Sequence, residues 1–89
     1  MMPLLTDRVV LVSGGTSGLG AAIARAAARE GALVAVTGRR REPGEALAAE
    51  LVAAGTKALF VQADAADVEQ ARASVTATVA GFGRVDSLV

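Results

Sequence analysis

Several residue types are missing from this 89-residue chain: it has no cysteine, histidine, tryptophan, tyrosine or asparagine, and Lys57 is its only lysine. Without cysteine there is no disulfide framework and no thiolate, as expected for a cytoplasmic protein. Without imidazole or thiolate groups, a zinc site lacks its usual ligands and a serine–histidine–aspartate triad cannot form. We therefore expect no metal site and no catalysis of these types.

An excess of charge of either sign is also missing, because nine basic and nine acidic residues cancel. This balance argues against a nucleic-acid or membrane-surface partner. No apolar run approaches the ~18 residues of a membrane span, and Met1-Met2-Pro3 does not open a signal peptide.

What the chain does have is apolar content of 53%, mostly alanine, valine and leucine. Apolar runs of strand length occur at residues 8–13, 33–37 and 58–61, and a fourth begins at 85. Segments of helical character separate them and end near Glu30, Gly55 and Gly83. The order β-α-β-α-β-α-β with right-handed crossovers predicts a partial doubly wound, Rossmann-like α/β fold. Residues 1–89 then form part of one domain, with a parallel sheet in the strand order 3-2-1-4.

Three local features refine these helices. Pro43 is expected as the first residue of the second helix. Asp67 is expected to cap the third helix, with Gln70 completing a capping box. Helical spacing predicts that the third helix turns one face to the sheet, formed by Val68, Ala71, Val75, Val79 and Phe82, with Arg72 snorkelling at its edge.

The segment between the first strand and the first helix, Ser13-Gly14-Gly15-Thr16-Ser17-Gly18-Leu19-Gly20, is rich in glycine. Such a loop allows a tight turn and a close approach of the backbone to a ligand, while the N–H groups at the helix start face a pyrophosphate. Gly20 is expected to let the helix sit close to the strand. The spacing is G-x-x-x-G-x-G, and no Gly-Lys-Ser/Thr follows, which excludes a Walker-type phosphate loop. The predicted cofactor contacts in this loop are Gly14, Thr16, Ser17, Gly18, Leu19 and Gly20.

With Ser13 in the threonine position, the loop resembles the T-G-x-x-x-G-x-G motif of the short-chain dehydrogenase/reductase family. Thr37-Gly38-Arg39, the pair Asp64-Ala65 and the segment from Gly83 to Val89 resemble three further motifs of that family, in the same order. The resemblance covers the chain from about Asp7 to Val89. It implies that the cofactor is a nicotinamide dinucleotide.

The end of the second strand bears on which dinucleotide is bound. In NAD-selective proteins an acidic residue about 20 positions after the last glycine accepts from the ribose 2′-OH. Gly38 and Arg39 stand at that distance, and neither is acidic. The guanidinium of Arg39 suits a 2′-phosphate, which favours NADP(H) and leaves NAD(H) as the alternative. The alternative interpretation is that the three consecutive arginines have no binding role and form a solvated loop.

The resemblance implies that Asp64 receives the adenine amino group and that the backbone at Ala65 lines the adenine pocket. A turn residue ahead of the Asp67 cap is the other interpretation of Asp64. Asp86, which stands before the fourth strand, is expected to be structural.

Members of the family use a tyrosine, a lysine, a serine and an asparagine to move a proton as the hydride is transferred. This chain has no tyrosine or asparagine, so no residue is assigned a catalytic role and the chain alone is expected to be inactive. We expect the N-terminal cofactor-binding part of an NADP(H)-preferring oxidoreductase, truncated within its fourth strand, whose homo-oligomeric parent acts on a carbonyl or alcohol. A non-catalytic dinucleotide-binding module and an interaction subunit completed by a partner chain are the alternatives.

Overall fold

The computed structural model describes residues 4–16 and 18–89 of the chain. Its centre is a four-stranded sheet with the order β3-β2-β1-β4, in which all neighbouring strands are parallel. The elements along the chain are β1 (Val9–Val12), α1 (Gly18–Arg29), β2 (Leu33–Gly38), α2 (Arg41–Ala53), β3 (Ala58–Gln62), α3 (Val68–Phe82) and β4 (Ser87–Leu88). The predicted alternation and strand order are confirmed, and the element ends differ from the prediction by at most three residues.

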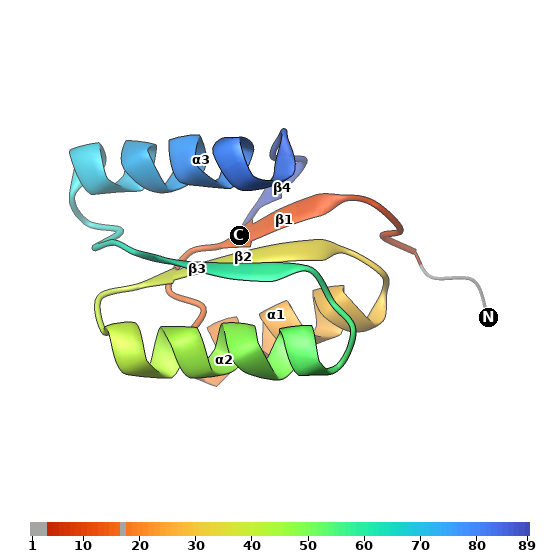
Figure 1. Ribbon diagram of the computed structural model, residues 1–89. Coiled ribbons are helices and arrows are strands. Elements are labelled where there is room, and N and C mark those ends of the chain that lie inside the picture. Colours follow the sequence, from red (N-terminus) through yellow and green to blue (C-terminus); the bar gives the residue numbers. More distant parts are fainter. Residues whose placement is uncertain (1–3, 17) are drawn as a thin grey trace.

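The sheet lies between two layers of helix, with α1 and α2 on one face and α3 on the other (Figure 1). The two central strands, β1 and β2, are covered on both faces, and every residue of β1 is buried. This double burial explains why their sequences are continuous apolar runs that do not alternate with polar residues.

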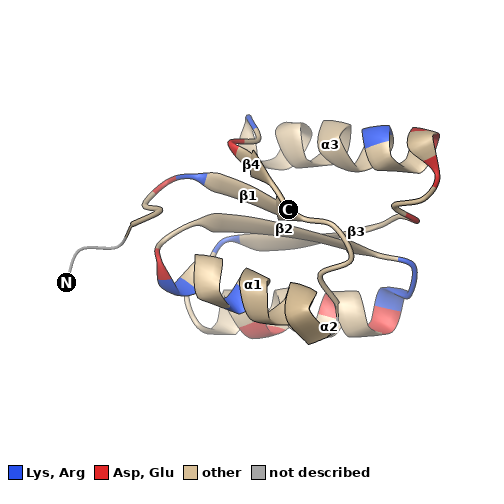
Figure 2. Cartoon of the chain, turned by 180° about the vertical axis from the view of Figure 1, so that it is seen from behind, with Lys and Arg blue, Asp and Glu red and all other residues tan. Residues whose placement is uncertain are grey.

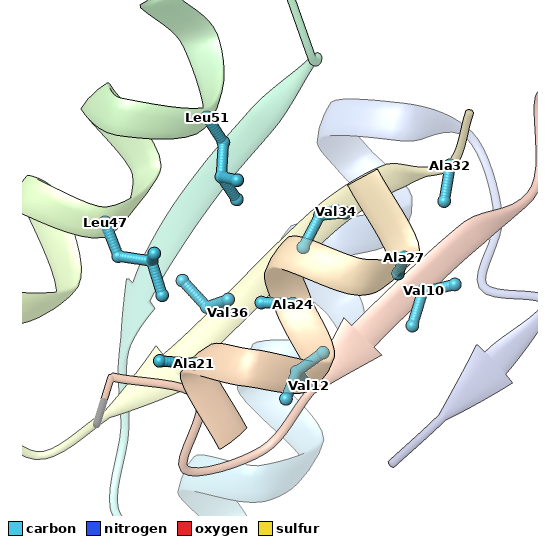
Figure 3. Packing of buried hydrophobic residues seen from close by; sticks show 10 residues of the cluster. All are labelled: Val10, Val12, Ala21, Ala24, Ala27, Ala32, Val34, Val36, Leu47 and Leu51. Carbon is cyan, nitrogen blue, oxygen red and sulfur yellow. The ribbon is translucent and has the colours of Figure 1, made fainter. Parts of the chain in front are cut away.

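The main hydrophobic core lies between the sheet and the α1–α2 layer (Figure 3). Alternate residues of β1 and β2 point into it, and α2 contributes Leu47 and Leu51, which lie one turn apart on the helix. The fully buried residues of α1 are all alanines, whose small side chains let the helix axis lie close to the strands. The cluster comprises Val10, Val12, Ala21, Ala24, Ala27, Ala32, Val34, Val36, Leu47 and Leu51.

The face that α3 turns to the sheet differs from the predicted one. Val68 and Val79 are 64% and 42% exposed, whereas Ser74 and Thr78 are 6% and 0% exposed. Both hydroxyls donate to carbonyl oxygens one turn back along the helix, Ser74 Oγ to Ala71 O at 2.6 Å and Thr78 Oγ1 to Ser74 O at 2.8 Å. Because the helix backbone satisfies these hydroxyls, they can be buried like small apolar groups. Ala71, Val75 and Phe82 of the predicted face are half-buried, and Arg72 is exposed, in keeping with its predicted place at the edge.

The helix termini confirm some local predictions and correct others. Asp67 Oδ1 accepts from the Gln70 N–H at 3.1 Å, as predicted for a cap. The second bond of a capping box, from the N–H of Asp67 to the side chain of Gln70, does not form. Gln70 Oε1 accepts from the N–H of Asp64 instead, at 2.8 Å, so this part of the prediction is wrong. Pro43 is the third residue of α2, which begins at Arg41. It is tolerated there because N–H groups of the first turn have no acceptor within the helix.

The charged residues of α3 lie at its N-terminal end, and those of α2 lie along its length (Figure 2). In the part of the chain that the structure describes, no helix is long and apolar enough to cross a membrane.

Candidate cofactor-binding site

The loop after β1 contains two glycines in the left-handed region, Gly14 at φ 68° and Gly18 at φ 57°. Residues with a Cβ rarely adopt these angles, so the turn depends on glycine, as predicted. A Cβ built on either residue would meet no atom within 4 Å, so the space beside both glycines is open to a ligand. Ser17, another predicted contact, lies outside the described residues.

Gly20 is required by a close contact. A Cβ at this position would collide with the carbonyl oxygen of Gly14 and lie 2.9 Å from Cα of Gly15. We expected this glycine to bring the helix close to the strand, but the contact is with the backbone of the loop itself. The first turn of α1 therefore packs directly on the glycine loop. Leu19, beside it, is 77% exposed.

Thr37 in β2 fixes the start of the loop, a role that the sequence did not reveal. Its Oγ1 accepts from the N–H of Gly14 at 3.3 Å, and its carbonyl oxygen accepts from the N–H of Gly15 at 3.0 Å. Thr37 is only 2% exposed, so its hydroxyl is a buried polar group with a defined partner. The one signal in the sequence is a hydroxyl residue near the end of an otherwise apolar strand.

These two bonds also show which N–H groups of the loop remain for a ligand. Those of Gly14 and Gly15 are used by Thr37. Those of the first helical turn, Gly18–Gly20, have no acceptor within α1, because the acceptor would lie four residues earlier. Together with the positive end of the helix dipole, they make this turn the place where an anion is best bound.

The carboxyl end of β2 lies against the glycine loop. A Cβ on Gly38 would be 2.5 Å from Thr16 Cγ2 and 3.1 Å from Thr16 Oγ1. Any side chain at position 38, an aspartate included, would have to displace Thr16. The next residue, Arg39, is exposed, and its guanidinium makes no ion pair or hydrogen bond within residues 4–16 and 18–89. A cationic side chain thus follows directly on the residue that touches the loop.

Asp64 and Ala65 follow β3 at the same edge of the sheet. Asp64 Oδ1 accepts from the N–H of Ala66 at 2.9 Å, so the carboxylate does hold a turn. In the described part of the chain no hydrogen bond uses the other oxygen, Oδ2. The interpretations of Asp64 as a turn residue and as a ligand contact are therefore compatible, because each needs one oxygen.

A cleft of about 460 Å³ opens between the carboxyl edge of the sheet and α3. It brings Ala65 together with Ser13 and Thr37, from three different strand ends, and its surface is mainly apolar. Gly14, Arg39 and Asp64 are not among the residues that line it. The lining residues are Ser13, Thr37, Ala63, Ala65, Ala71, Arg72, Ser74, Val75, Leu88 and Val89.

Asp86 lies away from this edge, near the amino ends of the strands. Its Oδ2 accepts from the N–H of Val9 at 2.8 Å and from Nε of Arg84 at 2.9 Å. The Val9 N–H, followed by the Arg84 guanidinium, lowers the pKa of Asp86 below its ordinary value. These contacts support the structural role predicted for this residue.

In a parallel sheet with this strand order, the direction in which successive strands are added reverses between β1 and β4. Ligands of such folds bind at that point, beside the carboxyl ends of the strands. The glycine loop lies there, with open space beside two glycines and with first-turn N–H groups that have no acceptor within α1. This fold and this site define a dinucleotide-binding protein of the doubly wound class.

Comparison with known proteins identifies the family within this class. The sequence profile of the short chain dehydrogenase family matches residues 8–89. The chain is 49% identical over 84 residues to an A-factor type gamma-butyrolactone 1′-reductase of Streptomyces virginiae, covering 94% of this chain and 33% of that protein. It is 43% identical over 90 residues to an L-rhamnose 1-dehydrogenase (NAD(P)(+)) of Azotobacter vinelandii, covering 97% and 35%.

Two solved structures are similar throughout the chain. A short chain dehydrogenase from Mycobacterium smegmatis superposes with a TM-score of 0.92 at 32% identity, covering 97% of this chain and 37% of the other. A blue fluorescent protein from a metagenomic library, in complex with NADPH, gives a TM-score of 0.90 at 40% identity, covering 94% and 35%.

The chain belongs to the short-chain dehydrogenase/reductase family, whose members are oxidoreductases that bind a nicotinamide dinucleotide. It spans about a third of the length of the curated relatives it matches.

Proposed function

We propose that this chain is the cofactor-binding part of a short-chain dehydrogenase/reductase that prefers NADP(H). The parent enzyme transfers a hydride between the nicotinamide and a carbonyl or alcohol substrate. The bound dinucleotide supplies the hydride chemistry, and the residues of this chain bind and orient it. None of them is assigned a catalytic role.

The observation that carries the NADP(H) preference is the contact between Gly38 and Thr16. It leaves no room for a carboxylate at position 38 unless Thr16 moves. It also sets Arg39, whose guanidinium has no partner among the described residues, next to the glycine loop. A guanidinium offers a 2′-phosphate paired hydrogen bonds and a full charge, whereas a 2′-hydroxyl gains little from it.

The other assignments follow from the same edge of the sheet. The N–H groups of the first turn of α1 bind the pyrophosphate, and Gly14 and Gly18 keep the approach clear. Thr16 and Leu19 flank the cofactor. Asp64, through its unused Oδ2, accepts from the adenine amino group while the backbone at Ala65 lines the adenine pocket. Ser17 is included from the sequence motif alone. A cytoplasmic location and a homo-oligomeric parent stay predictions from the sequence.

The test is a titration of the chain with NADPH and with NADH, followed by the fluorescence of the reduced nicotinamide. Because the protein has no tryptophan or tyrosine, it adds little background emission. We expect the wild type to bind NADPH more tightly than NADH. Arg39→Gln should lower NADPH affinity by about tenfold, the scale of one hydrogen bond to a charged group, and leave NADH affinity nearly unchanged. Arg39→Asp should reverse the preference.

Arg29→Gln is the matched control, because Arg29 is an exposed arginine in the last turn of α1, at the end opposite the glycine loop. It should bind both cofactors as the wild type does. Equal affinity of the folded wild type for NADPH and NADH would refute the proposed preference. Equal loss of NADPH affinity in both arginine variants would refute the role of Arg39.

A further inference from the structure

The last residue of β3, Gln62, links two backbone segments that determine where Arg39 lies. Gln62 pairs with Gly38 in the parallel register of β2 and β3. Its side chain is exposed and makes two hydrogen bonds, both to the segment between β2 and α2. Nε2 donates to the carbonyl oxygen of Arg39 at 3.1 Å, and Oε1 accepts from Nη2 of Arg41 at 3.0 Å.

The chemistry of the two partners explains why this side chain is an amide. A carbonyl oxygen only accepts, and a guanidinium only donates, so the bridging group must offer one donor and one acceptor at its tip. A carboxylate would keep the bond to Arg41 but face the Arg39 carbonyl with a second acceptor. A methionine of similar length would lose both bonds.

The bridge separates the roles of the three consecutive arginines, which form the basic segment at the N-terminal end of α2 (Figure 2). Arg41 is held by Gln62 and, through Nη1, by Glu45 at 3.0 Å. Within the described ranges, the side chains of Arg39 and Arg40 make no such bonds. The Arg41 side chain is thus bonded to residues of α2 and β3, while the guanidinium groups of Arg39 and Arg40 have no partner among the described residues and can bind a phosphate.

The backbone before Arg39 is held as well. The N–H of Ala63, the residue after Gln62, donates to the Gly38 carbonyl at 2.9 Å, and Gly38 lies against Thr16 of the glycine loop. With the Arg39 carbonyl bound to Gln62, the peptide groups on both sides of the Arg39 Cα are fixed. A long, flexible side chain that starts from a fixed backbone loses less entropy when it binds a phosphate.

We propose that Gln62 is a positioning residue for selection of the 2′-phosphate. It fixes the backbone from which Arg39 reaches the cofactor, while Arg41 stays bonded to Gln62 and Glu45. This inference rests on the proposed NADP(H) preference and deepens it, because it places part of the specificity on β3, outside the β2 segment that carries the arginine.

The experiment compares NADPH and NADH affinities of the full chain in three variants. Gln62→Met should lower the ratio of NADPH to NADH affinity by about three- to tenfold, the effect of losing one typical hydrogen bond, with little change for NADH. Gln62→Glu should lower the ratio at least as much, although it retains the partner of Arg41. Gln70→Met is the matched control: its Oε1 contacts Asp64, on the proposed adenine side, so it should shift both affinities together and leave the ratio unchanged.

A second measurement needs no cofactor. Amide hydrogen exchange of Ala63, whose N–H donates to the Gly38 carbonyl beside Arg39, should be faster in Gln62→Met than in the wild type, because the segment after β2 opens more often once the bridge is lost. An unchanged NADPH:NADH ratio in a folded Gln62→Met protein would overturn the positioning role and leave the NADP(H) preference standing. A fallen ratio with unchanged exchange would also overturn it, since Gln62 would then act by direct contact. A wild type that does not distinguish the two cofactors would refute the proposed preference itself, and this inference with it.

Discussion

At the amino end of the sheet, the carboxylate of Asp86 holds together two strand starts that are far apart in sequence. It accepts from the N–H of Val9, 77 residues away, and from Arg84, whose Nη2 also donates to the carbonyl oxygen of Asp7 at 2.9 Å. Arg8 adds a longer ion pair at 3.9 Å. Asp86 thereby fixes the amino ends of β1 and β4. The proposed cofactor site lies at the opposite, carboxyl ends of the same strands.

This carboxylate predicts a dependence of stability on pH. The pKa of Asp86 in the folded chain is lowered from its ordinary 3.8, first by the Val9 N–H and then by Arg84. Because the ionised form is favoured by folding, its stabilisation is fully present above that ordinary value. It is lost as the pH falls through the lower, folded value.

We expect Asp86→Asn to lower the thermal unfolding midpoint at pH 7, and we expect the difference from wild type to shrink below about pH 4, where the unfolded carboxyl is protonated. Thermal unfolding followed by circular dichroism between pH 7 and pH 2.5 measures this. Glu50→Gln is the comparison: Arg25 lowers the pKa of Glu50 too, but this ion pair is exposed, so the substitution should lower the midpoint by less than Asp86→Asn does. A difference between wild type and Asp86→Asn that is constant across this range would contradict the assignment.

At the scale of elements, the docking of α1 on the glycine loop is the contact on which the site depends. The fully buried residues of the helix are all alanines, and the half-buried Ile23 is its one larger side chain packed against the core. The helix therefore contributes little side-chain volume to hold it in place. Its N-terminus is located instead by the packing of Gly20 on the backbone of Gly14 and Gly15. A change at Gly20 therefore acts on the loop and the helix together.

We expect Gly20→Ala to destabilise the chain by about 1–3 kcal/mol, the cost of overpacking a tight contact, although alanine is the better helix former. Urea unfolding measures the free energy. Gly81→Ala in α3 is the control, because its Cβ would meet only a methyl group, Leu59 Cδ2 at 2.7 Å, which can rotate away. It should change stability by less than about 1 kcal/mol in either direction. Equal effects of the two substitutions would show that the Gly20 contact has no special role.

At the scale of the whole molecule, the least covered part of the structure is β4. It pairs with β1 through two residues, Ser87 and Leu88, and Leu88 and Val89 are 63% and 53% exposed. Mainly apolar clefts lie on both sides of it, one of about 460 Å³ beneath α3 and one of about 340 Å³ along α1. An exposed edge strand with apolar flanks favours association between chains.

We therefore expect the 89-residue chain to associate as its concentration rises, and we expect Leu88→Lys to shift it towards the monomer, because a charged edge residue opposes strand pairing. Sedimentation velocity over a hundredfold range of concentration tests this. Val52→Lys is the matched control, since Val52 is a similarly exposed valine on α2, 54% accessible. A monomer at every concentration, with cooperative thermal unfolding, would contradict the expectation.

The sequence alone determined the alternation of strands and helices, the strand order and the position of the glycine loop. These follow from local rules: apolar runs form buried strands, glycine permits left-handed turns, and right-handed crossovers leave few topologies. The family and the cofactor class were also predictable, because their motifs are short and contiguous.

Only the tertiary structure decided which side chains hold the site in place. Thr37 anchors Gly14, Gly38 touches Thr16, and Gln62 bridges Arg39 and Arg41. Each contact joins residues more than 20 positions apart, so no local pattern predicts it. The buried face of α3 was mispredicted for a related reason. Hydropathy favoured Val68 and Val79, whereas the helix buries Ser74 and Thr78, whose hydroxyls are satisfied by backbone carbonyls that appear only once the helix has formed.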